Sequence, residues 1–134
     1  PFDDDSIKAN KLEADALSFI IDMARNKKIT LINSAMLVYE NSLNPFPERK
    51  VFVDEILGLS GTYENITEFT RQRGLGIEEK YRLYPADALH LAIAELVQVD
   101  YFLTCDYTLI KRYKGSVAVV NPLVFIKQYE NDIR

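Results

Sequence analysis

The sequence predicts one α/β domain in which helices cover both faces of a mainly parallel β-sheet. Helical patterns alternate with short apolar runs along the chain, and parallel strands are joined through such helices. The length of 134 residues suits one core rather than two. Apolar residues make up 48% of the chain and charged residues 27%, as in ordinary folded proteins. We therefore expect a single domain over residues 1–134.

The first third of the chain predicts a long helix, a strand and a second helix. Apolar residues recur every three or four positions over about 6–26, and three aspartates at 3–5 are suited to cap the start of that helix. The apolar, β-branched run Ile29–Ile32 predicts a buried strand. Ser34 predicts the N-cap of a helix to about residue 44, which Pro45 and Pro47 end.

The remaining elements are predicted by similar local signals. In the middle of the chain we expect a helix over 50–57, a brief strand over 62–66, and a helix over 68–73 that Gly74 ends. In the last third we expect a helix over 85–97 that begins at Pro85, strands over 101–104 and 117–120, and a last helical turn or two after Pro122.

Composition and charge limit the classes of partner. No apolar segment is long enough to span a bilayer, and the acidic start PFDDDSIK does not resemble a secretory signal. Cys105 is the only cysteine, which excludes an internal disulfide and favours a reducing, cytoplasmic location. The net charge of −4 means that a nucleic acid would have to bind through a metal or a local basic cluster.

Three basic clusters are candidates for such binding. They are Arg71 with Arg73, Lys80 with Arg82, and Lys111 with Arg112 and Lys114. Taken alone, each cluster is better explained as a solvated face or a helix end.

Three acidic residues occupy positions that local structure alone does not fully explain. Glu40 interrupts the apolar stripe of its helix, so it is either partly buried beside a cation or donor, or placed at an edge where its carboxylate reaches water. Asp87 lies in the first turn of the 85–97 helix, where capping is the simpler explanation. Asp106 follows a strand, at the edge where α/β sheets bind ligands, although a turn-forming role also fits.

Taken together, the three carboxylates indicate a metal site. Clustered carboxylates repel one another unless a cation lies between them, and hard oxygen ligands favour Mg²⁺ or Mn²⁺. A metal held in this way suits hydrolysis of phosphodiester bonds. Thr104, two residues before Asp106, could orient a ligand or a metal-bound water.

Two other chemistries were weighed against this hypothesis. His90 and Cys105 could form a thiol–imidazole pair, but carboxylates nearby would raise the pKa of the thiol and disable it as a nucleophile. We expect His90 to be a packed residue that hydrogen-bonds a backbone or carboxylate group. A phosphoacceptor domain of response-regulator type would want a lysine at the end of the last strand, where this chain has Asn121 and Pro122.

Three segments resemble the C-terminal half of the PIN domain in order, spacing and residue type. They are Pro85-Ala-Asp-Ala-Leu-His-Leu-Ala-Ile-Ala, Val99-Asp-Tyr-Phe-Leu-Thr-Cys-Asp106 and Val119-Val-Asn-Pro122. The segment 34–41, which contains Glu40, resembles the second acidic element of that family. The start Pro1-Phe-Asp-Asp resembles the stretch after the first strand in a bacterial and archaeal branch. The likeness thus covers nearly the entire chain.

The resemblance implies a three-layer α/β/α fold and a divalent-metal-dependent ribonuclease. It carries over Glu40, Asp87 and Asp106 as Mg²⁺ or Mn²⁺ ligands and catalytic residues, with Thr104 as an auxiliary catalytic residue. Many small bacterial and archaeal members are toxins of VapC type, which a protein antitoxin inhibits, and they are often homodimers. The alternative is a catalytically impaired PIN-like module that binds RNA or a protein.

One departure from the family pattern generates a prediction. The leading strand of the family carries an Asp-Thr pair shortly before the Pro-Phe-Asp-Asp stretch, and this sequence begins after that point, so the first strand is expected to be missing. The 134-residue form is therefore expected to bind metal weakly and to cut RNA poorly. Full metal-dependent cleavage by this form, lost entirely on Asp87→Asn, would show that the strand is dispensable.

Overall fold

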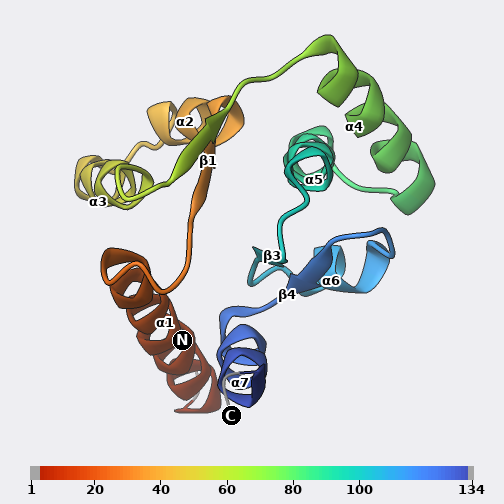
Figure 1. Ribbon diagram of the computed structural model, residues 1–134. Coiled ribbons are helices and arrows are strands. Elements are labelled where there is room, and N and C mark those ends of the chain that lie inside the picture. The colour runs from red at the N-terminus through yellow and green to blue at the C-terminus, as the bar shows by residue number, and fades with distance from the viewer. Residues whose placement is uncertain (1–3, 133–134) are drawn as a thin grey trace.

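The computed structural model describes residues 4–132 (Figure 1). Residue Asp3 and the side chains of Asp4 and Asp5 lie outside what it describes, and with them the predicted capping of the first helix. The helices are α1 (Asp4–Arg25), α2 (Ala35–Ser42), α3 (Pro47–Leu57), α4 (Glu68–Tyr81), α5 (Pro85–Val97), α6 (Tyr107–Arg112) and α7 (Pro122–Asp132). The strands are β1 (Ile32–Ser34), β2 (Thr62–Glu64), β3 (Tyr101–Leu103) and β4 (Ala118–Val120). Within this described range, no helix has the length and apolar character needed to cross a membrane.

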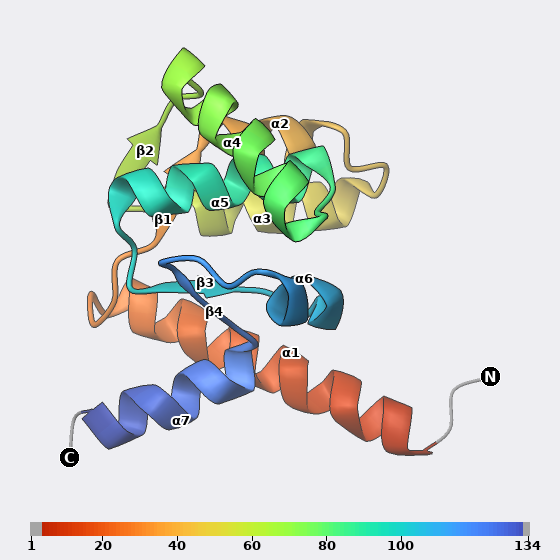
Figure 2. The ribbon, with the colours of Figure 1, turned by 90° about the vertical axis from the view of Figure 1, so that its right-hand side faces the viewer.

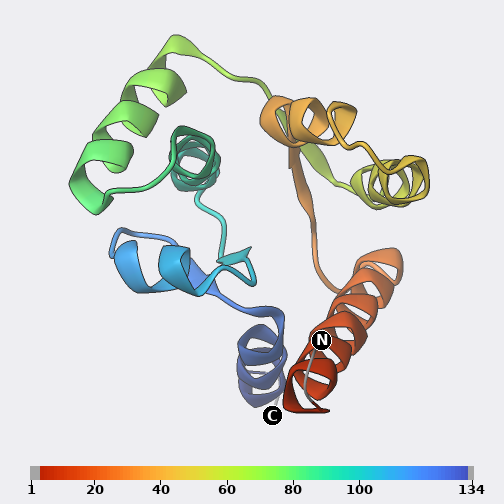
Figure 3. The ribbon, with the colours of Figure 1, turned by 180° about the vertical axis from the view of Figure 1, so that it is seen from behind.

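The strands form two separate parallel pairs. β1 pairs with β2, with Ile32 opposite Thr62, and β3 pairs with β4, with Tyr101 opposite Ala118. The predicted parallel pairing is thus confirmed. A single central sheet is not what residues 4–132 form, and Figure 3 shows the two pairs on opposite sides of the ribbon's open centre.

The β3–β4 pair has helices packed on both of its faces. Phe102 and Val119 pack against a core formed mainly by α4, α5 and α6. The alternate residues Tyr101, Leu103 and Val120 pack against a second core formed by α1 and α7. This alternation follows from the two-residue repeat of a strand. Figure 2 shows the two strands between α5 on one side and α1 with α7 on the other.

Local sequence signals placed several elements correctly. The long first helix and the 85–97 helix are confirmed as α1 and α5. Ser34 is the N-cap of α2, and its hydroxyl accepts a hydrogen bond from the Leu37 amide at 3.1 Å. The first strand lies further along the chain than predicted, at Ile32–Ser34, and Pro47 begins α3 as well as following the end of α2. The last helix continues to Asp132, well beyond two turns.

The predicted end of a helix at Gly74 is wrong. α4 begins with a capping box between Thr67 and Thr70 and runs through Gly74 to Tyr81. A Cβ atom at Gly74 would lie 3.5 Å from the Cα atom of Leu89, so the glycine permits close contact between α4 and α5. A packing role explains this glycine better than a breaker role.

A polar network ties α4, α5 and the turn after α6 together. The guanidinium of Arg73 donates to Glu95 Oε1 from Nε at 3.0 Å and from Nη2 at 2.7 Å. The Tyr113 hydroxyl donates to Glu95 Oε2 at 3.1 Å, and it accepts a hydrogen bond from the Val117 amide. The charge of Arg73 is therefore paired with Glu95 within the fold, so we treat Arg73 as a structural residue and not as a candidate for RNA binding.

The core beneath α4 generates a prediction about stability. Ile77 is fully buried, so Ile77→Ala is expected to lower the free energy of unfolding by about 2–5 kcal/mol, measured by urea denaturation. Leu75 lies on the same helix and is 59% exposed, so Leu75→Ala is the matched control and is expected to change it by about 0.5 kcal/mol or less. Equal effects of the two substitutions would contradict the described packing of α4.

Candidate functional site

Three helices bring the predicted acidic residues toward one region. Asp87 lies in the first turn of α5, and α2, which carries Glu40, packs against α5. Asp106 is the N-cap of α6, directly after the β3 strand. The side chains thus come from α2, α5 and the end of β3, as the sequence pattern predicted.

Asp106 is held firmly by backbone hydrogen bonds. Its Oδ1 atom accepts from the Thr108 amide at 2.9 Å and from the Leu109 amide at 3.2 Å. The Asp106 amide in turn donates to the Thr104 hydroxyl at 3.1 Å. Thr104 therefore acts on the backbone that positions Asp106, and the turn-forming and site-forming roles of Asp106 are compatible.

Glu40 is paired with the only histidine. Its Oε1 atom is in hydrogen-bond contact with His90 Nε2, which lies on α5 one turn after Asp87. The Glu40 side chain is 47% exposed and that of His90 is 11% exposed. The edge position for Glu40 is confirmed by this exposure. The expectation that His90 is packed and bonded to a carboxylate is also confirmed.

Electrostatics links Asp87 to both other carboxylates. The pKa of Asp87 is raised above its ordinary value of 3.8, chiefly by burial and then by the negative charge of Asp106. Glu40 raises this pKa further, while His90 lowers it. Burial and the two neighbouring carboxylates thus disfavour the charged form of Asp87, and a bound cation would favour it.

The carboxylates approach one another without forming a complete ligand set. Among residues 4–132, no group of three or more acidic, histidine or cysteine side chains is arranged so that it could hold an ion. The donor types nevertheless fit a hard divalent cation, because each is a carboxylate oxygen.

Cys105 is unsuited to nucleophilic catalysis. It is exposed, and burial of its sulfur raises the pKa of the thiol, with a further increase from Glu13 on α1. The predicted direction of this shift is confirmed, but its acidic neighbour is Glu13 rather than a site carboxylate. At neutral pH the thiol is protonated, which disfavours a cysteine hydrolase.

The α6 helix and its N-cap were missed in the sequence. The available signal was Asp106 followed by Thr108 and Leu109, a typical N-cap residue ahead of residues whose amides it can bind. The expected turn after β3 is therefore the start of a helix. This start fixes the direction in which Asp106 leaves the strand.

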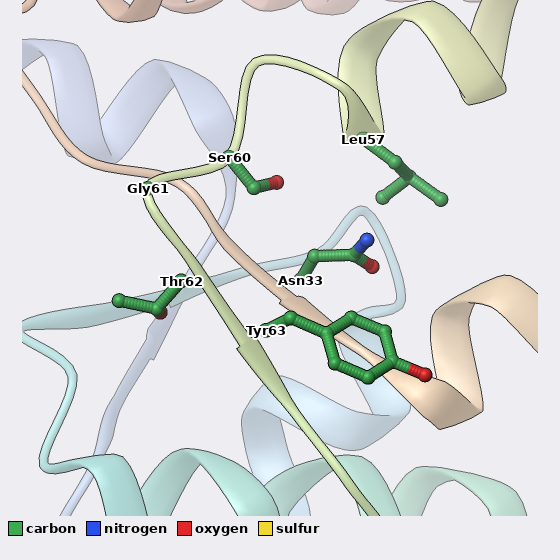
Figure 4. Close-up of a pocket in the computed structure, with 6 residues that line it drawn as sticks. All are labelled: Asn33, Leu57, Ser60, Gly61, Thr62 and Tyr63. Atoms are coloured by element: carbon green, nitrogen blue, oxygen red, sulfur yellow. The ribbon is translucent and has the colours of Figure 1, made fainter.

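A separate pocket lies between the C-terminal end of α3 and the β1–β2 pair (Figure 4). Its volume is about 240 Å³, and its lining residues are Asn33, Leu57, Ser60, Gly61, Thr62 and Tyr63. None of these is an acidic residue. The pocket is thus not part of the carboxylate site.

The raised pKa of Asp87 generates a prediction about stability and pH. A carboxyl group whose pKa is raised by folding opposes folding as pH increases above the unfolded-state value, which is near 3.8. Asp87→Asn removes this charge and is expected to raise the melting temperature at pH 7, with a gain that shrinks below about pH 4. Asp15→Asn, on an exposed position of α1, is the control for the chemical change. A pH-independent gain would contradict the electrostatic origin.

Comparison with known proteins identifies the family. The family model of the PIN domain matches residues 14–115, which include Glu40, Asp87, Thr104 and Asp106. Searches of curated proteins and of solved structures give no match. The matched segment covers most of the chain and contains all four predicted site residues, so this chain belongs to the PIN domain family.

Proposed function

We propose that this protein is a ribonuclease that cleaves phosphodiester bonds with a divalent metal held by Glu40, Asp87 and Asp106. PIN domains are generally nucleases that require metal ions. The observation that carries the proposal is the placement of three carboxylates in one region: Asp87 in the first turn of α5, Asp106 after β3, and Glu40 on α2, which packs against α5. The pKa of Asp87 is raised, first by burial and then by the charges of Asp106 and Glu40, which agrees with this placement. Carboxylates gathered in this way are typical of sites that bind cations.

The residues of the site have distinct roles in this proposal. Mg²⁺ or Mn²⁺, when bound, supplies an activated water and stabilises charge on the phosphate. Asp106 is a preorganised ligand because two backbone amides fix its Oδ1 atom. Thr104 positions Asp106 through its backbone amide, and its hydroxyl is the candidate auxiliary group for orienting the attacking water.

Glu40 is the ligand that must rearrange. Its contact with His90 holds the carboxylate on the α5 side of the site. Repulsion from Asp87 opposes a closer approach until a cation is present. We expect the exposed Glu40 side chain to complete the ligand set only on metal binding.

The finer biological assignments extend the family resemblance. We propose RNA rather than DNA as the substrate, a cytoplasmic location, and a homodimer. We also propose that a protein antitoxin is the natural inhibitor if the protein is a toxin of VapC type.

A second candidate function is a PIN-like module that binds RNA or a protein without cleavage. It is favoured by the incomplete ligand set in residues 4–132 and by the net charge of −4. RNA binding that is independent of Mn²⁺, with no cleavage, would support this alternative. Cleavage that requires Mn²⁺ would support the nuclease.

The nuclease proposal predicts the effect of removing single carboxylates. End-labelled RNA is incubated with the protein and Mn²⁺, with EDTA as the metal-free control, and products are resolved by electrophoresis. Asp87→Asn and Asp106→Asn are each expected to reduce the cleavage rate by roughly 10²- to 10³-fold, because each removes charge that holds the metal in the transition state.

Cys105→Ser is the matched control in this assay. It alters the residue next to Asp106 without removing a carboxylate, so the cleavage rate is expected to stay close to that of the parent protein. Loss of cleavage on Cys105→Ser but not on Asp87→Asn would reject the metal site in favour of thiol chemistry.

A further inference from the structure

Folding joins two basic clusters that are about 30 residues apart in the sequence. Arg112 Nη1 donates a hydrogen bond to the carbonyl oxygen of Arg82 at 2.8 Å. The rings of Tyr81 and Tyr113 pack with their centroids 5.0 Å apart. Because the cations flank these two tyrosines in the sequence, the ring contact brings the two clusters together. We call this set of four residues the basic junction: Lys80, Arg82, Arg112 and Lys114.

The cations of the basic junction are available for a ligand. All four residues are exposed. Within the described part of the chain none of them forms an ion pair with a carboxylate, whereas Arg73 nearby is paired with Glu95. Lys80 lies over the ring of Tyr81, with its Nζ atom 5.4 Å from the ring centroid, so its charge is held beside the two packed tyrosines. The junction is a local concentration of positive charge on an acidic protein.

Two short segments connect the basic junction to the carboxylate site. From Arg82 the chain passes through Tyr84 and reaches Asp87 in five residues. From Arg112, α6 leads back to Asp106 at its N-cap, over a rise of roughly 9 Å for six residues. The junction therefore lies close enough to the carboxylates for one extended ligand to reach both.

Exposed tyrosines lie on both connecting segments. Tyr84, just before α5, is 79% exposed, and Tyr107, at the start of α6, is 66% exposed. A rigid aromatic ring beside unpaired cations is the combination that binds single-stranded nucleic acids, with bases stacked on the ring and phosphates near the cations. An acidic protein segment would use the cations but would gain nothing comparable from the bare rings.

We propose that the basic junction and Tyr84 form the surface that holds single-stranded RNA beside the carboxylate site. Phosphates bind the cations of the junction, and a base stacks on Tyr84. The proposal deepens the function above and rests on it for the choice of RNA as the ligand. It also explains how a protein of net charge −4 can bind a polyanion, since the acidic site is reached from a basic surface.

The test measures RNA binding without cleavage. A fluorescently labelled, unstructured RNA of mixed sequence is titrated with the full chain in EDTA at several salt concentrations. The variant Lys80→Gln with Lys114→Gln is expected to reduce the slope of log affinity against log salt by about 1.4, since each lost phosphate contact contributes about 0.7 for a single strand. Lys28→Gln with Lys127→Gln removes the same charge from exposed positions near α1 and α7, and is expected to leave the slope unchanged.

The aromatic part of the surface is tested separately. Tyr84→Ala is expected to weaken RNA binding by roughly 5- to 100-fold, because a stacked base is lost. Tyr84→Phe keeps the ring and is expected to bind within about threefold of the parent protein. Circular dichroism melts of all variants exclude unfolding as the cause.

Three outcomes would overturn the inference. The first is that the junction and control variants have equal salt slopes. The second is that Tyr84→Ala and Tyr84→Phe lose the same amount of RNA binding. The third is that poly-glutamate displaces the RNA as effectively as unlabelled RNA does. Poly-glutamate competition of that kind would indicate an acidic protein as the partner.

Failure of the proposed nuclease function gives a different result. Junction-dependent binding with no cleavage in Mn²⁺ would reject the nuclease and retain the RNA-binding surface. Metal-dependent cleavage with junction-independent binding would retain the nuclease and reject this surface.

Discussion

The packing of α5 is the constraint on which the rest of the structure depends. Its buried residues Ala88, Leu91 and Ala92 belong to the larger core, where α4 packs closely because Gly74 has no side chain. The same helix presents Asp87 in its first turn and His90 one turn later. Since α2 also packs against α5, the position of this one helix determines how near Glu40 comes to Asp87.

The surroundings of Asp87 disfavour its ionised form. Burial, and then the charges of Asp106 and Glu40, raise the pKa of Asp87, so the folded protein disfavours the charged form of this carboxyl group. Perturbed pKa values of this kind are common at functional sites. Substitutions that stabilise the protein at such sites commonly reduce activity. The basic junction has the opposite character, since its cations are exposed and cost little free energy to maintain.

The sequence predicted the elements whose signals are local. Pro85 at the start of α5 and Ser34 as the N-cap of α2 act within one helical turn, so both could be predicted without knowledge of the fold. Gly74 could not, because its role depends on Leu89 in a neighbouring helix. The separation of the strands into two pairs is also a long-range property. Of the candidate site, the sequence could nominate residues by their type and position, whereas the contact between His90 and Glu40 depends on how two helices pack.

The elements that carry the three candidate carboxylates differ in how many of their residues are buried. α3 has no buried residue and α2 has only Asn41, whose side chain bonds Lys50 and Asp54 on α3. Asp87 instead lies on α5, which contributes several buried residues to the larger core, and Asp106 caps α6, whose one buried residue, Leu109, belongs to the same core. Segments with few buried contacts open at lower free energy than the core does. Glu40 thus lies on the less buried of these elements, and an ion that bound all three carboxylates, as we propose, would couple α2 and α3 to the same cooperative unit as the core.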